Sequence, residues 1–183
     1  MASRAPSLAL SSWPFAGAPS HGACCSKPPT PSWRRCSKGV RRSAMIKTYV
    51  DANALIAAFR GDHPASDQAL RLLGEPGRAF VASAYLRLET LRKPLFYKRE
   101  DEIAFMDCYF SAVSLWVPTT DTLVEHALVL AAQRDLGAMD ALHAVAALQA
   151  GAEVFVTLER PTKPLFHVPG LNTISLHPKQ IDL

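Results

Sequence analysis

Short apolar runs alternate with helix-like segments from residue 45 onward, and this alternation restricts the possible folds. The runs at 45–50, 79–83 and 154–157 are rich in β-forming residues and end at turn or polar residues. Val117 and residues 173–176 indicate two further strands, and the intervening segments have helical spacing. Such alternation is typical of a parallel sheet covered by helices on both faces. We therefore predict an α/β fold: a three-layer α/β/α sandwich with a central, mainly parallel sheet of about five short strands.

The first 44 residues have a different composition. They contain seven Lys or Arg and no Asp or Glu, and they are rich in Ser and Pro. A segment of this kind buries too little apolar surface to offset its chain entropy. We expect residues 1–44 to be a disordered basic tail, either a transit-like segment or a misassigned start before Met45. The folded domain is expected to span residues 45–183.

Charge and cysteine content narrow the functional classes. The sequence pI is about 9.0, but residues 45–183 hold all 16 acids against only 13 Lys and Arg. The basic character therefore belongs to the tail and does not by itself indicate nucleic-acid binding. Cys108 is the single cysteine after residue 44, which predicts a reducing, cytoplasmic location. The sequence contains no apolar run of ~20 residues, so no membrane partner is expected.

Four acidic residues flank the predicted strands. Asp51 ends the first strand, Glu89 lies in the helix after the second, Asp140 opens the helix before the fourth, and Glu159 follows the fourth. The carboxyl ends of parallel strands meet at one edge of a sheet, where ligands bind. Carboxylates that converge there raise one another's pKa values unless a cation lies between them. Oxygen ligands of this kind select Mg²⁺ or Mn²⁺.

Each acid also has a purely structural interpretation. Asp51 and Asp140 stand where an aspartate can cap a helix, and Glu89 could lie on a solvated helix face. Glu159 could form a surface ion pair with Arg160. These interpretations require four independent coincidences of placement, so we favour a shared site.

Four sequence segments carry a family resemblance. "TYVDANALIAAF" resembles the opening of PIN-domain proteins, and "SAYLRLETLRKPL" is similar to their second motif, with its acid in a helix. "MDALHAVAALQAGAEVFVTLERP" resembles the third motif and the following strand, and "VPGLNTISL" is similar to the family's closing strand. The resemblance runs from Met45 to about Leu176 and is most specific in the third segment.

The resemblance implies a VapC-like metal-dependent endoribonuclease, the toxin of a type II toxin–antitoxin pair. It implies that Asp51, Asp140 and Glu159 hold Mg²⁺ or Mn²⁺, which would lower the pKa of a bound water and polarise the phosphodiester. Glu89 would orient that water or complete a second metal site. Glu159 stands where the family usually has Asp. The positions that often support the family's site are Asn53 and Thr157.

Three partners are expected: an RNA substrate, a cognate antitoxin and a second copy of the chain. Basic residues that could neutralise RNA phosphates cluster on and after the Glu89 helix, interleaved with Phe96 and Tyr97. They could equally form a solvated face paired with the acids at 100–102. We expect a homodimer if Phe105, Tyr109 and Trp116 are exposed. The expected RNA-binding residues are Arg87, Arg92, Lys93, Lys98 and Arg99.

Two other functions stay open from the sequence. The Glu159 departure fits a non-catalytic PIN-fold module that binds RNA or protein. A phosphohydrolase with Asp51 as nucleophile is disfavoured, because that chemistry usually needs a second Asp where Asn53 stands. We expect His143 to be a packed or hydrogen-bonded histidine and Cys108 to belong to the core.

Overall fold

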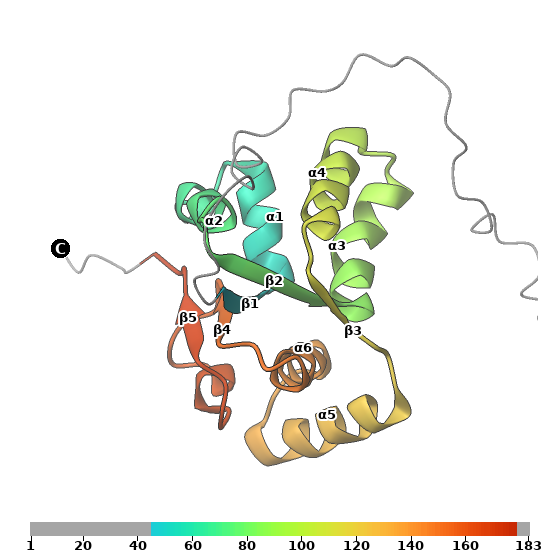
Figure 1. Cartoon of the computed structure of the whole chain (residues 1–183), viewed down its shortest axis with the longest axis vertical. Helices are drawn as coiled ribbons and strands as arrows, with labels where there is room; N and C mark the ends of the chain where they lie inside the picture. Colours follow the sequence, from blue (N-terminus) through green and yellow to red (C-terminus); the bar gives the residue numbers. More distant parts are fainter. Residues whose placement is uncertain (1–44, 179–183) are drawn as a thin grey trace, which may run out of the picture. The chain divides into compact units, whose positions relative to one another are not determined.

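The computed structural model describes residues 45–178, and the predicted disorder of residues 1–44 lies outside these residues. The described part contains six α-helices, one short 3-10 helix and five strands (Figure 1). In chain order they are β1 (Ile46–Val50), α1 (Ala52–Arg60), α2 (Ser66–Leu73), β2 (Arg78–Ser83), α3 (Ala84–Phe96), α4 (Glu100–Ser111), β3 (Leu115–Val117), α5 (Asp121–Arg134), α6 (Ala138–Gln149), β4 (Val154–Thr157), η2 (Pro164–His167) and β5 (Thr173–Ser175).

The strands form one sheet in the order β3-β2-β1-β4-β5. Every pairing in it is parallel. Helices α1 to α4 lie on one side of the sheet and α5 and α6 on the other (Figure 1). The predicted α/β/α sandwich with a parallel sheet of five short strands is therefore confirmed.

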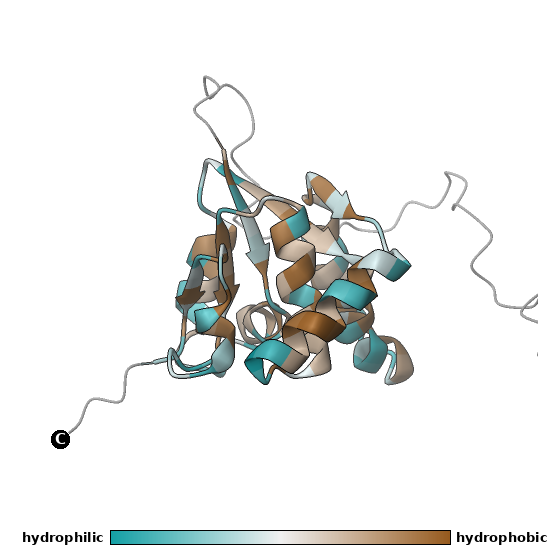
Figure 2. Ribbon diagram, turned by 90° about the horizontal axis from the view of Figure 1, so that it is seen from below, coloured by the Kyte–Doolittle hydropathy of each residue, from teal (hydrophilic) through white to brown (hydrophobic). Residues whose placement is uncertain are grey.

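The central strand β1 supplies much of the core. Tyr49 is fully buried and stacks on Phe155 of β4, with ring centroids 5.4 Å apart and planes 4° from parallel. Because successive strand residues face opposite sides of a sheet, Val50 packs toward the helices of the other layer. Apolar and polar stretches alternate along the helices (Figure 2), as expected where one helix face covers the sheet.

The order in which strands are added to the sheet reverses at β1. Strands β2 and β3 lie on one side of β1, and β4 and β5 lie on the other. In open parallel sheets, ligands bind in the crevice beside the carboxyl ends of the strands at such a switch point. Asp51 follows β1 and Thr157 ends β4, so both lie at this crevice.

Local capping fixes where the helices begin and end. Ser83 Oγ accepts a hydrogen bond from Leu86 N–H at 3.4 Å, so Ser83 caps α3. Thr120 caps α5 in the same way, through the N–H of Leu123. Gly151, with a φ of 62°, follows α6 in the left-handed conformation that favours glycine.

A homodimer was expected if Phe105, Tyr109 and Trp116 are exposed, and two of these three residues are not. Tyr109 is 1% exposed, and Phe105 packs against Phe59 with ring centroids 5.6 Å apart. Helix α4 ends before Trp116, which lies in β3 and is 40% exposed. The expectation was wrong for Phe105 and Tyr109 because their side of α4 packs into the core. Self-association stays a prediction without a defined surface.

Two further features complete the fold. The 3-10 helix η2 was not predicted, because its four residues are too few to show a period. Within residues 45–178, no helix combines the length and the apolarity that crossing a bilayer requires.

Candidate functional site

Asp51 is held by backbone and side chain at the sheet's switch point. Its Oδ1 accepts a hydrogen bond from Ala52 N–H at 2.8 Å, so it does cap α1. Its Oδ2 accepts one from the Thr157 hydroxyl of β4 at 2.9 Å. The side chain is 5% exposed. Capping and a site role are therefore compatible, since each carboxylate oxygen keeps a further lone pair.

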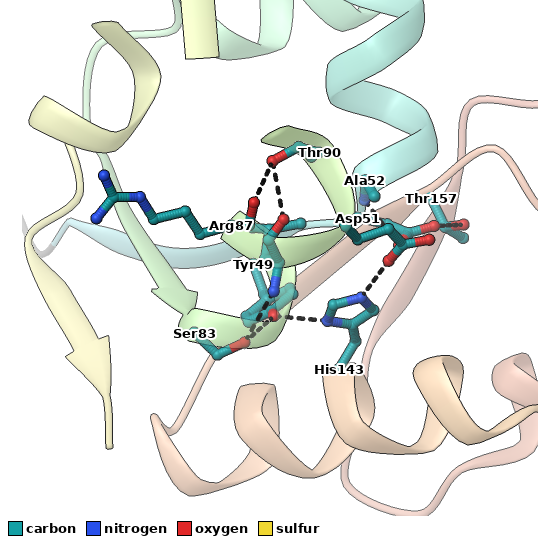
Figure 3. Close-up of polar contacts among 10 residues, drawn as sticks. Tyr49, Asp51, Ala52, Ser83, Arg87, Thr90, His143 and Thr157 are labelled. Atoms are coloured by element: carbon teal, nitrogen blue, oxygen red, sulfur yellow. Dashed lines mark hydrogen bonds and ion pairs between the residues drawn. The ribbon is translucent and has the colours of Figure 1, made fainter. Parts of the chain in front are cut away.

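Glu89 reaches the same place from α3 and is held by α6. Its Oε2 lies 2.7 Å from Nε2 of His143, which is 1% exposed. The other ring nitrogen, Nδ1, lies 2.9 Å from the Tyr49 hydroxyl, which lies 2.9 Å from Ser83 Oγ. Figure 3 shows Tyr49, Ser83 and His143 joined by these contacts, with Asp51 beside them. The prediction that His143 is a packed, hydrogen-bonded histidine is confirmed.

Asp140 and Glu159 face a small cavity next to this cluster. They line it together with Lys163, and its volume is about 150 Å³. Asp140 lies in the first turn of α6, but it makes no capping bond; Gly137 is the N-cap residue. No ion pair joins Glu159 to Arg160 in the part of the chain that the structure describes.

Thr157 connects the two groups of acids. Its Oγ1 donates to Asp51 and accepts the backbone N–H of Glu159 at 3.1 Å. Asn53, the other residue expected to support the site, is solvent-exposed in the first turn of α1. The structure therefore gives Thr157 a direct contact with an acid, whereas the Asn53 side chain makes none with the acids in the described residues.

The pKa values reflect this crowding. Burial raises the pKa of Asp51 to about 6, and the charge of Glu89 adds to the increase, while His143 and the Thr157 hydroxyl oppose it. Burial also raises the pKa of Asp140, and the charges of Glu159 and Glu89 act in the same direction. Each acid thus lies within electrostatic reach of another, as expected of carboxylates that converge on one site.

These residues fit a divalent cation. Asp51, Glu89 and His143 each offer a ligand atom within 4.8 Å of the others. Both nitrogens of His143 are already engaged, so the available donors are the carboxylate oxygens. Oxygen donors of this kind suit Mg²⁺ and Mn²⁺, and a cation would also relieve the mutual repulsion that adds to the effect of burial on the pKa values.

The expected RNA-binding residues all lie on the surface. Arg87, Arg92, Lys93, Lys98 and Arg99 are exposed along α3 and the turn after it. Arg99 lies over the Tyr97 ring at 5.2 Å and pairs with Glu102 at 3.3 Å. Phe96 is 78% exposed. The surface thus combines exposed basic side chains and exposed aromatic rings with one of the anticipated ion pairs, so both interpretations of these residues stay open.

Sequence reasoning missed the residues that hold Glu89 in place. Neither Tyr49 nor Ser83 was a candidate, because Tyr49 is accounted for as part of an apolar strand and Ser83 as a helix cap. One signal was available for His143: it stands three residues after Asp140, so both lie on the same side of α6. Its contact with Glu89 depends on how α3 and α6 pack.

Comparisons with known proteins show the family and the fold of this chain. The family model of the PIN domain matches residues 48–160, whereas no curated protein sequence matches the chain. VapBC2 from Rickettsia felis, solved with a promoter DNA fragment, is 17% identical with a TM-score of 0.55, covering 71% of this chain and 98% of that one. DNA-bound VapBC from Salmonella typhimurium is 18% identical with a TM-score of 0.54, covering 72% and 99%.

A toxin–antitoxin complex from Klebsiella pneumoniae is 21% identical with a TM-score of 0.52, covering 71% of this chain and 98% of that one. At these identities the structures establish a shared fold. The family match covers more than half of the sequence and includes all four acids of the site. The chain therefore belongs to the PIN-domain family.

Proposed function

We propose that this protein is a metal-dependent endoribonuclease that hydrolyses RNA phosphodiester bonds. The observation that carries the proposal is that two pairs of carboxylates, Asp51 with Glu89 and Asp140 with Glu159, lie close enough for the charge of Glu89 to raise the pKa values of both Asp51 and Asp140. A structural role would not require acids to be brought together against their repulsion. A site for a cation and a phosphodiester gives that arrangement a purpose.

In this proposal Asp51, Asp140 and Glu159 bind Mg²⁺ or Mn²⁺. A divalent ion held there lowers the pKa of water and polarises the scissile phosphodiester. Glu89 orients the attacking water or completes a second metal site. Thr157 keeps the Asp51 carboxylate directed into the crevice through its 2.9 Å hydrogen bond. Lys163 adds a positive charge at the rim of the cavity, where a phosphate oxygen would enter.

The exposed basic residues of α3 and the following turn are the proposed RNA contacts. Arg87, Arg92 and Lys93 lie on the same helix as Glu89, so an RNA strand bound along α3 passes the acids. Exposed aromatic rings at the end of α3 can stack unpaired bases. Alanine at Arg92 and Lys93 should lower RNA affinity and reduce its dependence on salt, whereas alanine at the exposed Arg71 of α2 should change neither.

The test of the proposal is cleavage of RNA by the full-length chain. We expect cleavage with Mg²⁺ or Mn²⁺ and none with EDTA. Asp51→Asn should reduce the rate by more than the roughly 10–100-fold that loss of an outer-sphere partner costs. Asp107→Asn makes the same chemical change at an exposed position on α4 and should leave the rate unchanged. Full activity of Asp51→Asn would show that the proposal is wrong.

We further propose that a small antitoxin binds this chain. The support is the similarity in fold to VapBC and other toxin–antitoxin complexes. Co-expression with the product of an adjacent small reading frame, followed by co-purification and loss of RNA cleavage, would test it. A non-catalytic binding module stays the second candidate, and it predicts that calorimetry detects no Mn²⁺ binding.

A further inference from the structure

His143 has no ring nitrogen left for a ligand. Nε2 contacts Glu89 Oε2 at 2.7 Å and Nδ1 contacts the Tyr49 hydroxyl at 2.9 Å, with the ring 1% exposed. The tyrosine hydroxyl in turn contacts Ser83 Oγ at 2.9 Å (Figure 3). Four side chains from four different elements thus form one buried chain of hydrogen bonds.

For a neutral imidazole, the donors and acceptors in this chain of hydrogen bonds fit one proton order. An ionised Glu89 can only accept, so Nε2 of His143 must carry a hydrogen. In a neutral imidazole Nδ1 then accepts, and the Tyr49 hydroxyl donates to it. The Tyr49 oxygen is left to accept from Ser83. The reverse order in a neutral ring would place the Nε2 lone pair against a carboxylate oxygen.

Both ends of this chain of hydrogen bonds lie at α3, the helix that contains Glu89. Ser83 caps the first turn of α3 by accepting the N–H of Leu86, and Glu89 lies further along the same helix. Tyr49 of β1 and His143 of α6 join these two points. Because Tyr49 stands two residues before Asp51, the same contacts fix the position of Glu89 relative to Asp51.

We propose that His143 is a positioning residue that holds the Glu89 carboxylate beside Asp51 by donating from Nε2–H, and that the Tyr49 hydroxyl at Nδ1 selects this tautomer of the ring. The inference rests on the proposed function in what Glu89 is positioned for, and of the two roles given to Glu89 it takes the one in which Glu89 completes a metal site beside Asp51. A ligand role for His143, which its distance from the two acids would allow, is excluded by this assignment.

The first test is ¹⁵N NMR of the histidine ring in the full-length, metal-free protein under mildly alkaline conditions. We expect the Nε2–H tautomer in the wild type and a mixture of tautomers in Tyr49→Phe. Tyr109→Phe is the matched control, because its buried hydroxyl has no hydrogen-bond partner among the described residues. An Nδ1–H ring, an imidazolium, or an unchanged spectrum in Tyr49→Phe would overturn the proposal, as would loss of the Nε2 proton on adding Mg²⁺.

The second test is Mn²⁺ calorimetry on the full-length chain. His143→Leu should weaken binding by roughly 10–100-fold, and His143→Gln should restore part of it, because the glutamine amide can donate from about the position of Nε2. His126→Leu, at an exposed position on α5, should have no effect. Equal losses in the Leu and Gln variants would indicate a packing role only and overturn the proposal.

The two proposals fail in different ways. If the wild type binds Mn²⁺ and cuts RNA while His143→Leu binds the ion equally well, the positioning role fails and the nuclease stands. If the wild type neither binds the ion nor cuts RNA, the nuclease proposal fails, and the tautomer measurement still decides the proton order. The NMR comparison also covers the case in which His143→Leu does not fold.

Discussion

The two halves of the acidic site are built differently. Asp51 and Glu89 are tied by short hydrogen bonds to Ala52, Thr157 and His143. The carboxylates of Asp140 and Glu159 instead line an open cavity of about 150 Å³. Across residues 45–178, no side-chain hydrogen bond holds either of these two carboxylates in place. The fold therefore fixes one half of the site and leaves the other half adjustable.

The difference has a physical basis in burial. A deeply buried carboxylate is costly unless hydrogen bonds satisfy it, so Asp51 needs the partners it has. Asp140 is only half buried, and water can satisfy it. A cation or a phosphate that enters the cavity then supplies the contacts that the protein does not.

The largest expected effect is on the pH dependence of stability in EDTA. With a pKa of about 6 in the folded protein against 3.8 ordinarily, Asp51 keeps its proton in the native state after the unfolded chain has lost it. Stability should therefore fall as pH rises through this interval, by up to about 3 kcal/mol. Asp51→Asn should remove most of this fall, as measured by urea unfolding across the pH range.

The matched variant is Asp140→Asn. The pKa of Asp140 is raised in the same direction, but the group is less buried, so its removal should flatten the profile less. If Asp140→Asn flattens the pH profile of stability more than Asp51→Asn does, the view that Asp51 belongs to the more buried half of the site is wrong.

A smaller effect is expected from Thr157→Val. This change keeps the shape of the side chain but removes the hydroxyl that donates to Asp51, and should destabilise the protein by about 1–3 kcal/mol near neutral pH. Thr173→Val in β5 is the control, because the buried Thr173 hydroxyl has no partner within the described residues. Equal unfolding free energies for the two variants would contradict the view that the Asp51 half depends on its hydrogen bonds.

The smallest effect should come from Gly137→Ala. The new methyl group would lie 3.1 Å from Asp140 Oδ2, so this carboxylate must shift slightly. Alanine is a poorer N-cap than glycine, and the loss of stability should stay below about 1 kcal/mol. Calorimetry should show a few-fold change in Mn²⁺ affinity, less than for His143→Leu. Unfolding of the domain by this variant would show that the Asp140 half is as rigid as the other.

Much of the fold could be predicted because local signals and tertiary structure agree. The runs that become β1, β2 and β4 are short, apolar and closed by polar or turn residues. The expectation for Tyr109 failed because exposure depends on the layer that packs over α4. No local pattern distinguishes the covered side of a helix from the open side when both contain apolar residues.

The site was predictable to the extent that strand ends define it. Asp51 was identified by its place after a buried strand, and parallel pairing brings Thr157 to it. The role of His143 was not predictable, because it requires a helix from each side of the sheet to meet at one ring. Residue spacing along the sequence does not indicate which side chains from distant segments form hydrogen bonds with one another.

The pairing of β1 with β4 has a consequence for synthesis. Asp51 and its partner Thr157 are 106 residues apart in the chain. Strand β1, which lies between β2 and β4, is the first of the five described strands to be translated. A nascent chain therefore lacks the pairing of β1 with β4 until β4 leaves the ribosome. Any hydrolysis at this crevice would begin only after translation of the domain is nearly complete, so truncated products should be inert.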